Sequence, residues 1–339
     1  MIRAERTDRG AMRTGAVAWG RLLRQAALAA GLLAIATAPA RAAEDAAAWL
    51  AQVANAARQT NYVGIVVWQK GPLSESSRLI HYNERGIEVE KLVSLDGPPR
   101  EVVRGASEVR SYFPEAKLIR VEPPTFRNAF PSLAAAERKV LADNFDLRKG
   151  EVGRVAGLAA QAWVFEPKDT LRFGHKFWLD VNSGLLLKAQ ILNERGEVVE
   201  QITFSDVSIG VKMRRELVKP TWAGTAPDWK LHRAPPHDIE AQETGWLVGK
   251  VPPGFVKISE GYRTLRDRPE PVAHIVYSDG LTAISVFVER IGPVPRTVGP
   301  AQQGGVNIYI RPVDDCVVTV LGEVPGVTVR QMAHSVSRR

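Results

Sequence analysis

Hydrophobic spacing divides the chain into a short helical stretch and a long series of β-strands. Leu50, Val53, Ala54 and Ala57 recur at i, i+3, i+4 and i+7, which predicts a helix over residues 44–59 with one apolar stripe. After this helix, short runs rich in β-branched and aromatic residues alternate with turn residues, a pattern typical of antiparallel strands. The first predicted strands cover residues 62–69, 77–82, 88–95, 101–104, 109–113 and 117–121.

A second helical stretch, residues 133–142, interrupts the strands before they resume. The later strands are predicted at residues 145–148, 154–156, 162–166, 173–181, 185–192 and 198–207. One turn between them contains Asp180 and Asn182, whose side chains can accept hydrogen bonds from turn amides, and Gly184, which can adopt a positive φ. The pattern predicts one large, mainly antiparallel sheet with few helices, within the α+β class.

Periodicity fades between residues 209 and 243, where Pro220, Pro227, Pro235 and Pro236 accumulate. Such a stretch is typical of a linker that wraps the surface of a domain. The elements predicted after it are strands at residues 247–251, 272–278, 283–289, 306–311 and 316–321 and a helix at residues 328–337. They predict a second, small α+β domain.

An N-terminal signal peptide is predicted at residues 1–43. Several arginines precede an uncharged apolar run at residues 26–36, which is shorter than the roughly 20 residues that span a bilayer. Small residues suited to signal cleavage follow, and we expect cleavage between Ala40 and Ala43. The sequence therefore predicts an exported protein.

Either Met1 or Met12 fits as the initiator, because the basic stretch before the apolar run is long. The predicted division of the chain is a signal peptide (1–43), a large β domain (44–208), a linker (209–243) and a small C-terminal domain (244–339).

The net charge of the whole chain is +8, which is typical of a nucleic-acid-binding protein. Residues 1–43, however, carry seven arginines against Glu5 and Asp8, so the predicted mature chain keeps a charge of only +3. We therefore expect no nucleic acid among the partners.

No constellation in the sequence predicts catalysis, a metal site or a cofactor. His232 and His237 are the closest histidine pair, but the pair has no third ligand nearby, so surface histidines are the better interpretation. Asp314 and Asp315 precede a strand and are interpreted as a solvated turn. Cys316 is the only cysteine and is expected to be buried and inert, although an intermolecular disulfide is the alternative.

Four short segments of the sequence carry a resemblance to known proteins. The first two are Leu-Val-Ser-Leu-Asp-Gly-Pro-Pro-Arg-Glu-Val at residues 92–102 and Tyr-Val-Gly-Ile-Val-Val-Trp-Gln at residues 62–69. Both are similar to hallmark segments of the MucB/RseB family of sigma-E regulators. Residues 277–281 (Tyr-Ser-Asp-Gly-Leu) and 320–325 (Val-Leu-Gly-Glu-Val-Pro) resemble its second domain. The resemblance implies a large unclosed β-barrel similar to the carriers LolA and LolB, joined to a smaller α+β domain.

The resemblance also implies a function in the periplasm. Proteins of this family bind the periplasmic region of an RseA/MucA-type anti-sigma factor, shield it from site-one proteolysis and are released by lipid-like signals. Lipopolysaccharide or lipoprotein acyl chains are the implied lipids, and a homo-oligomer is possible. A periplasmic lipoprotein carrier or lipid-binding chaperone is the alternative function, and an unrecognised hydrolase is a third.

Apolar strand positions are the candidates for lipid binding, because each buried methylene contributes about 0.8 kcal/mol without any catalytic residue. The candidates are Val63, Ile65, Val67, Phe173, Phe177, Leu179 and Leu187. For any single one of these residues, a role in the core is the favoured alternative.

Basic residues in turn-rich parts of the C-terminal domain are the candidates for contact with an acidic partner peptide. They are Arg263, Arg266 and Arg290. A solvated basic face is at least as good an interpretation, because exposed ion pairs contribute little energy.

Overall fold

The structure is a computed structural model that describes residues 53, 55–123, 138–222, 228–233, 243–263, 270–292 and 297–339, with only the backbone described for 138–140. The predicted signal peptide lies outside these residues. Of the predicted helix at 44–59, residue 53 and residues 55–59 are described and are helical. No helix within the described ranges is long and apolar enough to cross a membrane.

Twelve strands form one large, mainly antiparallel sheet in the order β12-β6-β5-β4-β3-β2-β1-β11-β10-β9-β8-β7. The strands from its first half are β1 (Tyr62–Lys70), β2 (Leu73–Glu84), β3 (Ile87–Ser94), β4 (Glu101–Arg104), β5 (Val109–Phe113) and β6 (Leu118–Glu122). After α3 (Arg138–Asn144) come β7 (Phe145–Val155), β8 (Leu158–Pro167), β9 (Gly174–Asp180), β10 (Leu186–Leu192) and β11 (Val198–Ile209).

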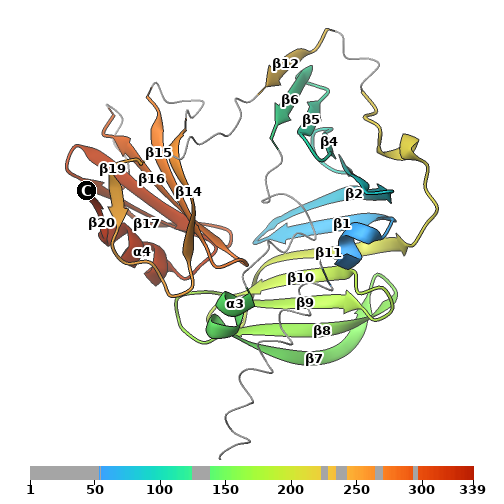
Figure 1. Ribbon diagram of the computed structural model, residues 1–339, viewed down its shortest axis with the longest axis horizontal. Helices are drawn as coiled ribbons and strands as arrows, with labels where there is room; N and C mark the ends of the chain where they lie inside the picture. The colour runs from blue at the N-terminus through green and yellow to red at the C-terminus, as the bar shows by residue number, and fades with distance from the viewer. Residues whose placement is uncertain are drawn as a thin grey trace, which may run out of the picture.

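Neighbouring strands in this sheet follow one another in sequence, except where β1 pairs with β11 and β12 pairs with β6. The sheet curves, so that β4, β5, β6 and β12 stand above the layer formed by β7 to β11 (Figure 1). Its outermost strands, β12 and β7, do not pair with each other. The large unclosed β-sheet implied by the family resemblance is therefore present.

The predicted turn after β9 forms with a changed set of side chains. Asp180 Oδ2 accepts hydrogen bonds from the backbone N–H and the hydroxyl of Ser183, both at 2.7 Å, and Gly184 has a φ of 72°. Ser183, rather than the predicted Asn182, is thus the second side chain of this turn. In the predicted and in the observed turn alike, side-chain oxygens accept hydrogen bonds from backbone N–H groups before the chain continues as β10.

Strand β7 is continuous where the sequence pattern predicted two short strands. A bulge between Lys149 and Val152 interrupts the alternation of apolar and polar positions, although the pairing with β8 continues on both sides of it. The two short strands were therefore a wrong interpretation of one bulged strand.

The predicted linker at 209–243 contains two elements that bind to the large sheet. The short 3-10 helix η2 (Arg215–Val218) packs on β2 and β3, where Val218 joins a cluster with Ile80 and Tyr82. Strand β12 (Lys230–Arg233) adds to the edge of the sheet in parallel to β6.

A buried ion pair fixes the segment just after η2. Lys91 Nζ lies 3.0 Å from a carboxylate oxygen of Glu101 and donates to Lys219 O and Thr221 Oγ1, both at 2.8 Å. Glu101 in turn accepts the backbone N–H of Thr221 at 2.8 Å. The chain between the domains is therefore bound to the large sheet by polar contacts as well as apolar ones.

The second domain is built on a six-stranded antiparallel sheet in the order β14-β15-β16-β19-β18-β17. Its strands are β14 (Val256–Arg263), β15 (Val272–Ser278), β16 (Ala283–Arg290), β17 (Gly299–Gln303), β18 (Val306–Val313) and β19 (Cys316–Gly322). Strands β14 and β17 were not predicted, because both are outer strands with many exposed residues and lack the apolar runs by which buried strands are recognised.

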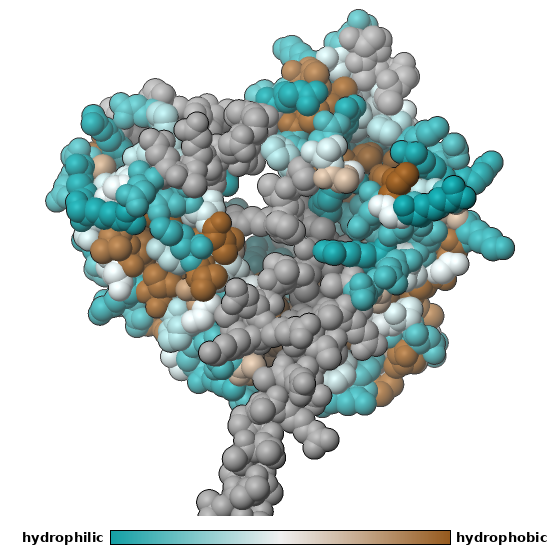
Figure 2. Space-filling view, viewed as in Figure 1, coloured by the Kyte–Doolittle hydropathy of each residue, from teal (hydrophilic) through white to brown (hydrophobic). Residues whose placement is uncertain are grey.

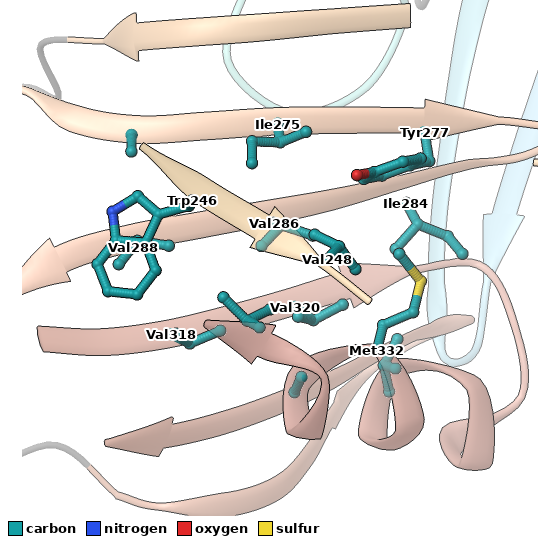
Figure 3. Packing of buried hydrophobic residues seen from close by; sticks show 14 of the residues in the cluster. Trp246, Val248, Ile275, Tyr277, Ile284, Val286, Val288, Val318, Val320 and Met332 are labelled. Atoms are coloured by element: carbon teal, nitrogen blue, oxygen red, sulfur yellow. The ribbon is translucent and has the colours of Figure 1, made fainter. Parts of the chain in front are cut away.

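Helix α4 (Gly326–His334) ends earlier than the predicted helix at 328–337. The chain continues as β20 (Val336–Arg338), which pairs with β13 (Trp246–Val248) in a small second sheet. Figure 3 shows Trp246 and Val248 from β13 and Met332 from α4 packed over Val286 and Val320 of the six-stranded sheet. Val336 of β20 is buried in the same cluster. Full burial of an aliphatic side chain contributes about 1.5–3 kcal/mol, and this favours a strand at the final residues over a longer helix.

Candidate functional site

The three lipid candidates on β1 lie on its less buried face. Val63, Ile65 and Val67 alternate along the strand and are half-buried, whereas Tyr62 and Val66 on the opposite face are buried. Val63 contacts the cluster that η2 covers. This face of β1 is therefore partly covered by the chain that leads to the second domain.

The four other lipid candidates are buried core residues. Phe177 and Leu179 belong to one cluster, in which the rings of Phe165 and Phe177 meet edge-on at 5.5 Å, and Leu187 belongs to a different cluster. Phe173 is buried as well. The structure thus brings Phe177 and Leu179 together but does not gather the seven candidates into one surface.

The strand register reveals an apolar row that the sequence pattern did not show. On the face of the sheet opposite to Val67, four half-buried residues lie in register with Phe177 across five adjacent strands. In order from β1 to β8, this apolar row is Trp68, Ile202, Ala189, Phe177 and Trp163. Register partners on neighbouring strands point to the same face, so these side chains form one strip.

The two domains are joined by a buried arginine. Arg172, which precedes β9, donates to Asp279 Oδ2 of the second domain at 3.0 Å and to Asp169 Oδ2 of its own domain at 2.9 Å. Its guanidinium also donates to Pro253 O and lies between the rings of Phe145 and Phe255, 5.4 and 5.3 Å from their centroids. We call this group the Arg172 clamp.

The environment of the Arg172 clamp affects its acidic partner. Burial raises the pKa of Asp279, even though backbone N–H groups and Arg172 stabilise its charged form. Beside the clamp, Thr328 Oγ1 at the start of α4 donates to Leu171 O at 2.8 Å. Asp279 lies in the segment 277–281 that carried the family resemblance, but sequence reasoning gave it no role.

A second polar contact joins the domains at the ends of β1 and β11. Lys70 Nζ lies 3.0 Å from a carboxylate oxygen of Glu200 and 3.0 Å from one of Glu323, and only Glu323 belongs to the second domain. The indole N–H of Trp68 donates to Glu200 Oε1 at 2.8 Å. Trp68 therefore connects the apolar row to this group of charges.

A pocket of about 650 Å³ lies in the second domain between the β13–β20 pair and the six-stranded sheet. Trp246, Tyr262, Arg290 and Arg338 are among its lining residues, and the Arg338 guanidinium lies over the Trp246 ring at 5.3 Å. The pocket offers aromatic and charged groups suited to side chains of a bound peptide.

Two of the three candidate partner arginines can be placed. Arg290 is exposed, lines the pocket and has a carboxylate oxygen of Glu270 at 3.9 Å. Arg263 is half-buried and follows Tyr262 at the end of β14, whereas Arg266 lies outside the described residues. The structure therefore brings Arg290 and the neighbour of Arg263 to one pocket.

Strand β14 is the outer strand of its sheet beside this pocket. Val256 and Ile258 on β14 and Leu247 on β13 are exposed. Figure 2 shows apolar side chains gathered over β13 and β14 on this face of the second domain. An outer strand with exposed apolar residues can pair with an extended peptide.

The residues considered for chemistry occupy structural positions. Cys316 is buried in the pocket wall and burial raises the pKa of its thiol, which agrees with the expected unreactive cysteine. Asp314 and Asp315 form the exposed turn before β19, as predicted. Within the described ranges, no group of three His, Cys, Asp or Glu residues could hold a metal ion. His232 is exposed on β12, and His237 lies outside the described residues.

Comparison with known proteins matches both domains. The family model of the MucB/RseB N-terminal domain matches residues 45–222, and that of the MucB/RseB C-terminal domain matches residues 240–337. The sigma factor AlgU regulatory protein MucB of Pseudomonas aeruginosa is 31% identical over 88% of this chain and 92% of its own length. The sigma-E factor regulatory protein RseB of Escherichia coli is 25% identical over 77% of this chain and 81% of its own.

A solved complex of MucA and MucB from Pseudomonas aeruginosa has a similar chain. That chain is 28% identical, with a TM-score of 0.69, over 87% of this chain and 99% of its own length. A structure of MucB in complex with MucA(peri) gives a TM-score of 0.68 at 27% identity, over 86% of this chain and 98% of that one. The curated relatives are named as regulatory proteins, which agrees with the expectation of a non-catalytic protein. The chain belongs to the MucB/RseB family.

Proposed function

We propose that this protein binds the periplasmic region of an anti-sigma factor and thereby restrains a sigma-E-type stress response. The observation that carries the proposal is the likeness, across both domains, to the MucB chain solved together with MucA. The periplasm is the proposed location, because the partner region lies there and the sequence begins with a predicted signal peptide.

The second domain is the proposed contact surface for the anti-sigma factor. Its pocket and β14, which is an outer strand of the sheet among the described residues, offer backbone hydrogen bonds and apolar contacts to an extended segment. Arg263, Arg266 and Arg290 remain proposed contacts for acidic side chains of that segment. A segment held in this way is withheld from a protease, because proteases bind their substrates as extended chains, and this is the proposed means of shielding against site-one cleavage.

Lipid is the proposed release signal, and the apolar row is its proposed binding surface. Acyl chains of lipopolysaccharide or lipoproteins can lie along the apolar row from Trp68 to Trp163, in which four side chains are half-buried and Phe177 is buried. Each methylene buried there contributes about 0.8 kcal/mol. Of the seven candidates from the sequence, Phe177 belongs to this row, and the other six are proposed to support the sheet around it.

Peptide binding and protease protection test the proposed function. Purified mature protein should bind the periplasmic domain of the cognate anti-sigma factor and slow its cleavage by the site-one protease. Arg290→Glu should weaken binding several-fold, more at low salt than at high salt, because Arg290 is exposed at the pocket. Arg195→Glu, in an exposed turn of the other domain, is the matched control. Absence of both binding and protection in the unaltered protein would refute the proposal.

The apolar row also keeps a lipoprotein carrier as the second candidate function. A carrier should move an acylated protein between two membranes, whereas the proposed regulator needs only to bind lipid. A transfer assay with labelled lipopeptide in donor and acceptor vesicles separates the two, since catalysed transfer together with a lack of anti-sigma factor binding would favour the carrier.

A further inference from the structure

Two of the polar contacts between the domains, the Arg172 clamp and the contact at Lys70, differ in how they can respond to protons. In the Arg172 clamp the cation is an arginine, which stays charged at all physiological pH values. In the contact at Lys70, one lysine faces two glutamates, Glu200 and Glu323, from different domains. With all three groups ionised, this mostly buried cluster carries an excess negative charge.

The cluster lowers that excess by holding a proton. Burial, followed by hydrogen bonding to Glu200 and the charge of Glu200, raises the pKa of Glu323 to about 7. Burial also acts to raise the pKa of Glu200, but hydrogen bonds from Glu323, Trp68 and Lys70 lower it below its ordinary value. Burial acts to lower the pKa of Lys70, and its hydrogen bonds to both glutamates outweigh this and raise it.

These shifts describe a carboxyl pair that shares one proton beside a protonated lysine. Two carboxyl groups at one site cannot easily both ionise, and the proton goes to the one with less stabilisation of its charge. Glu323 has Lys70 as its cation, whereas Glu200 has Lys70 and the indole of Trp68. The neutral arrangement is therefore protonated Glu323, ionised Glu200 and charged Lys70.

Of the described elements around the cluster, β2 brings the exposed Glu75 into register with Trp68, and the turn between β17 and β18 carries no charged residue. The turn between β17 and β18 approaches it through Gly304, where an added Cβ would lie 2.5 Å from the Lys70 side chain, and through Gly305, which lies against Val199. Burial and Glu200 raise the pKa of Glu323, and Lys70 acts to lower it.

We propose that Lys70, Glu200 and Glu323 form a proton-operated latch between the two domains, closed when the carboxyl pair holds one proton and loosened when both carboxylates are ionised. In the open arrangement Glu323 is solvated and titrates in the ordinary range of a glutamate. At pH values between the ordinary pKa of a glutamate and about 7, the closed arrangement therefore holds one more proton than the open arrangement. Closure is therefore favoured as the pH falls below 7 and is at its weakest above it.

The same linkage gives the size of the effect. The ratio of closed to open molecules should rise roughly tenfold for each unit of pH below 7, on the order of a hundredfold between pH 8 and pH 5. At still lower pH Glu200 also takes up a proton and its ion pair with Lys70 is lost. The latch thus makes the domain arrangement respond to mild acidification of the surrounding compartment.

Distance measurements between the domains of the full mature chain test the latch. Spin labels at Val152→Cys and Val298→Cys, two exposed positions in different domains, report the arrangement in a Cys316→Ser background. The distance distribution should be narrow at pH 5.5 and broaden by pH 8. Glu323→Gln, which imitates the protonated form, should keep the narrow distribution throughout this range.

Two further variants make the test specific. Glu200→Gln removes the second negative charge, so Glu323 should ionise at lower pH and the ion pair with Lys70 should hold the domains together at pH 8. Glu194→Gln, at an exposed turn, should behave like the unaltered chain. An unaltered chain whose distances do not change with pH, or a Glu323→Gln variant that changes as the unaltered chain does, would overturn the proposal. No anti-sigma factor is present in this experiment, so its outcome is independent of the proposed function.

Discussion

Replacing Arg172 by methionine should lower the free energy of unfolding and weaken the coupling between the two domains. The side chain is buried, and its substitution removes hydrogen bonds to Asp279, Asp169 and Pro253 O while methionine still fills part of the space between Phe145 and Phe255. Breaking one partner of a buried ion pair costs about 3–5 kcal/mol, chiefly because the other charge stays buried without compensation.

Asp279 limits that cost in two ways. Its other carboxylate oxygen, Oδ1, keeps hydrogen bonds from the N–H groups of Leu281 and Thr282, at 3.1 and 2.9 Å. In addition, burial already raises its pKa, and loss of Arg172 raises it further, so the carboxyl group can take up a proton instead of remaining charged. We therefore expect a loss near the lower end, about 3 kcal/mol at pH 8.

The pH dependence of this loss follows from the raised pKa. The penalty of a buried carboxylate is present above the folded-state pKa of Asp279 and is relieved as the pH falls through it. The Arg172→Met variant should therefore be less destabilised at pH 5 than at pH 8.

Urea unfolding of the full chain measures the effect. Arg172→Met should lower the unfolding midpoint or split the transition in two as the domains lose their coupling. Asp279→Asn in the Arg172→Met background should recover part of the stability, with a coupling free energy of about 1–3 kcal/mol. A loss below about 1 kcal/mol, or strictly additive effects of the two substitutions, would refute the assignment of Arg172 as the clamp between the domains.

Three further predictions concern the apolar row and the single thiol. Trp68→Phe keeps an aromatic ring but removes the hydrogen bond to Glu200, which connects the apolar row to the contact between the domains. Lipid should therefore still bind, but a higher lipid concentration should be needed to release the anti-sigma peptide, as a fluorescence titration would show. Ala189→Asp places a carboxylate in the apolar row and should lower lipopeptide affinity by roughly tenfold or more in calorimetry. Thr203→Asp, on the opposite face of the sheet, should leave that affinity unchanged. Equal effects of the two substitutions would contradict the proposed lipid surface. Cys316 should react with iodoacetamide more slowly than a free thiol at pH 8, because burial raises its pKa, and rapid alkylation of the folded chain would contradict its buried position.

The alternation of apolar residues was enough to place most strands, because strands buried on at least one face carry a period of two. Three of the predicted strands, at 101–104, 109–113 and 272–278, have the observed bounds. Strand β14 was missed because its outward position leaves Val256 and Ile258 among exposed polar residues. The helix at the C-terminus was predicted too long, since only the distant strand β13 decides that Val336 pairs as a strand.

Candidate residues were harder to identify than strands. The sequence identified Phe177 as apolar but did not show that Trp163 and Ala189 lie beside it, because register depends on which strands pair and on bulges such as that between Leu186 and Lys188. Arginines in turn-rich segments were found by composition, and of the two that lie within the described residues, Arg290 lines the pocket and Arg263 does not.

The mainly antiparallel β architecture, the presence of two domains and the family could all be predicted from the sequence, since they depend on local periodicity and on short segments such as residues 92–102. The folded chain was needed to show that Arg172 meets Asp279, 107 positions away, and that Lys70 meets Glu323, 253 positions away. No local pattern marks such pairs, because a charged residue at the end of a strand looks the same in sequence whether it faces water or another domain. Burial then gives these pairs their energy and their altered pKa values, and burial is a property of the assembled domains.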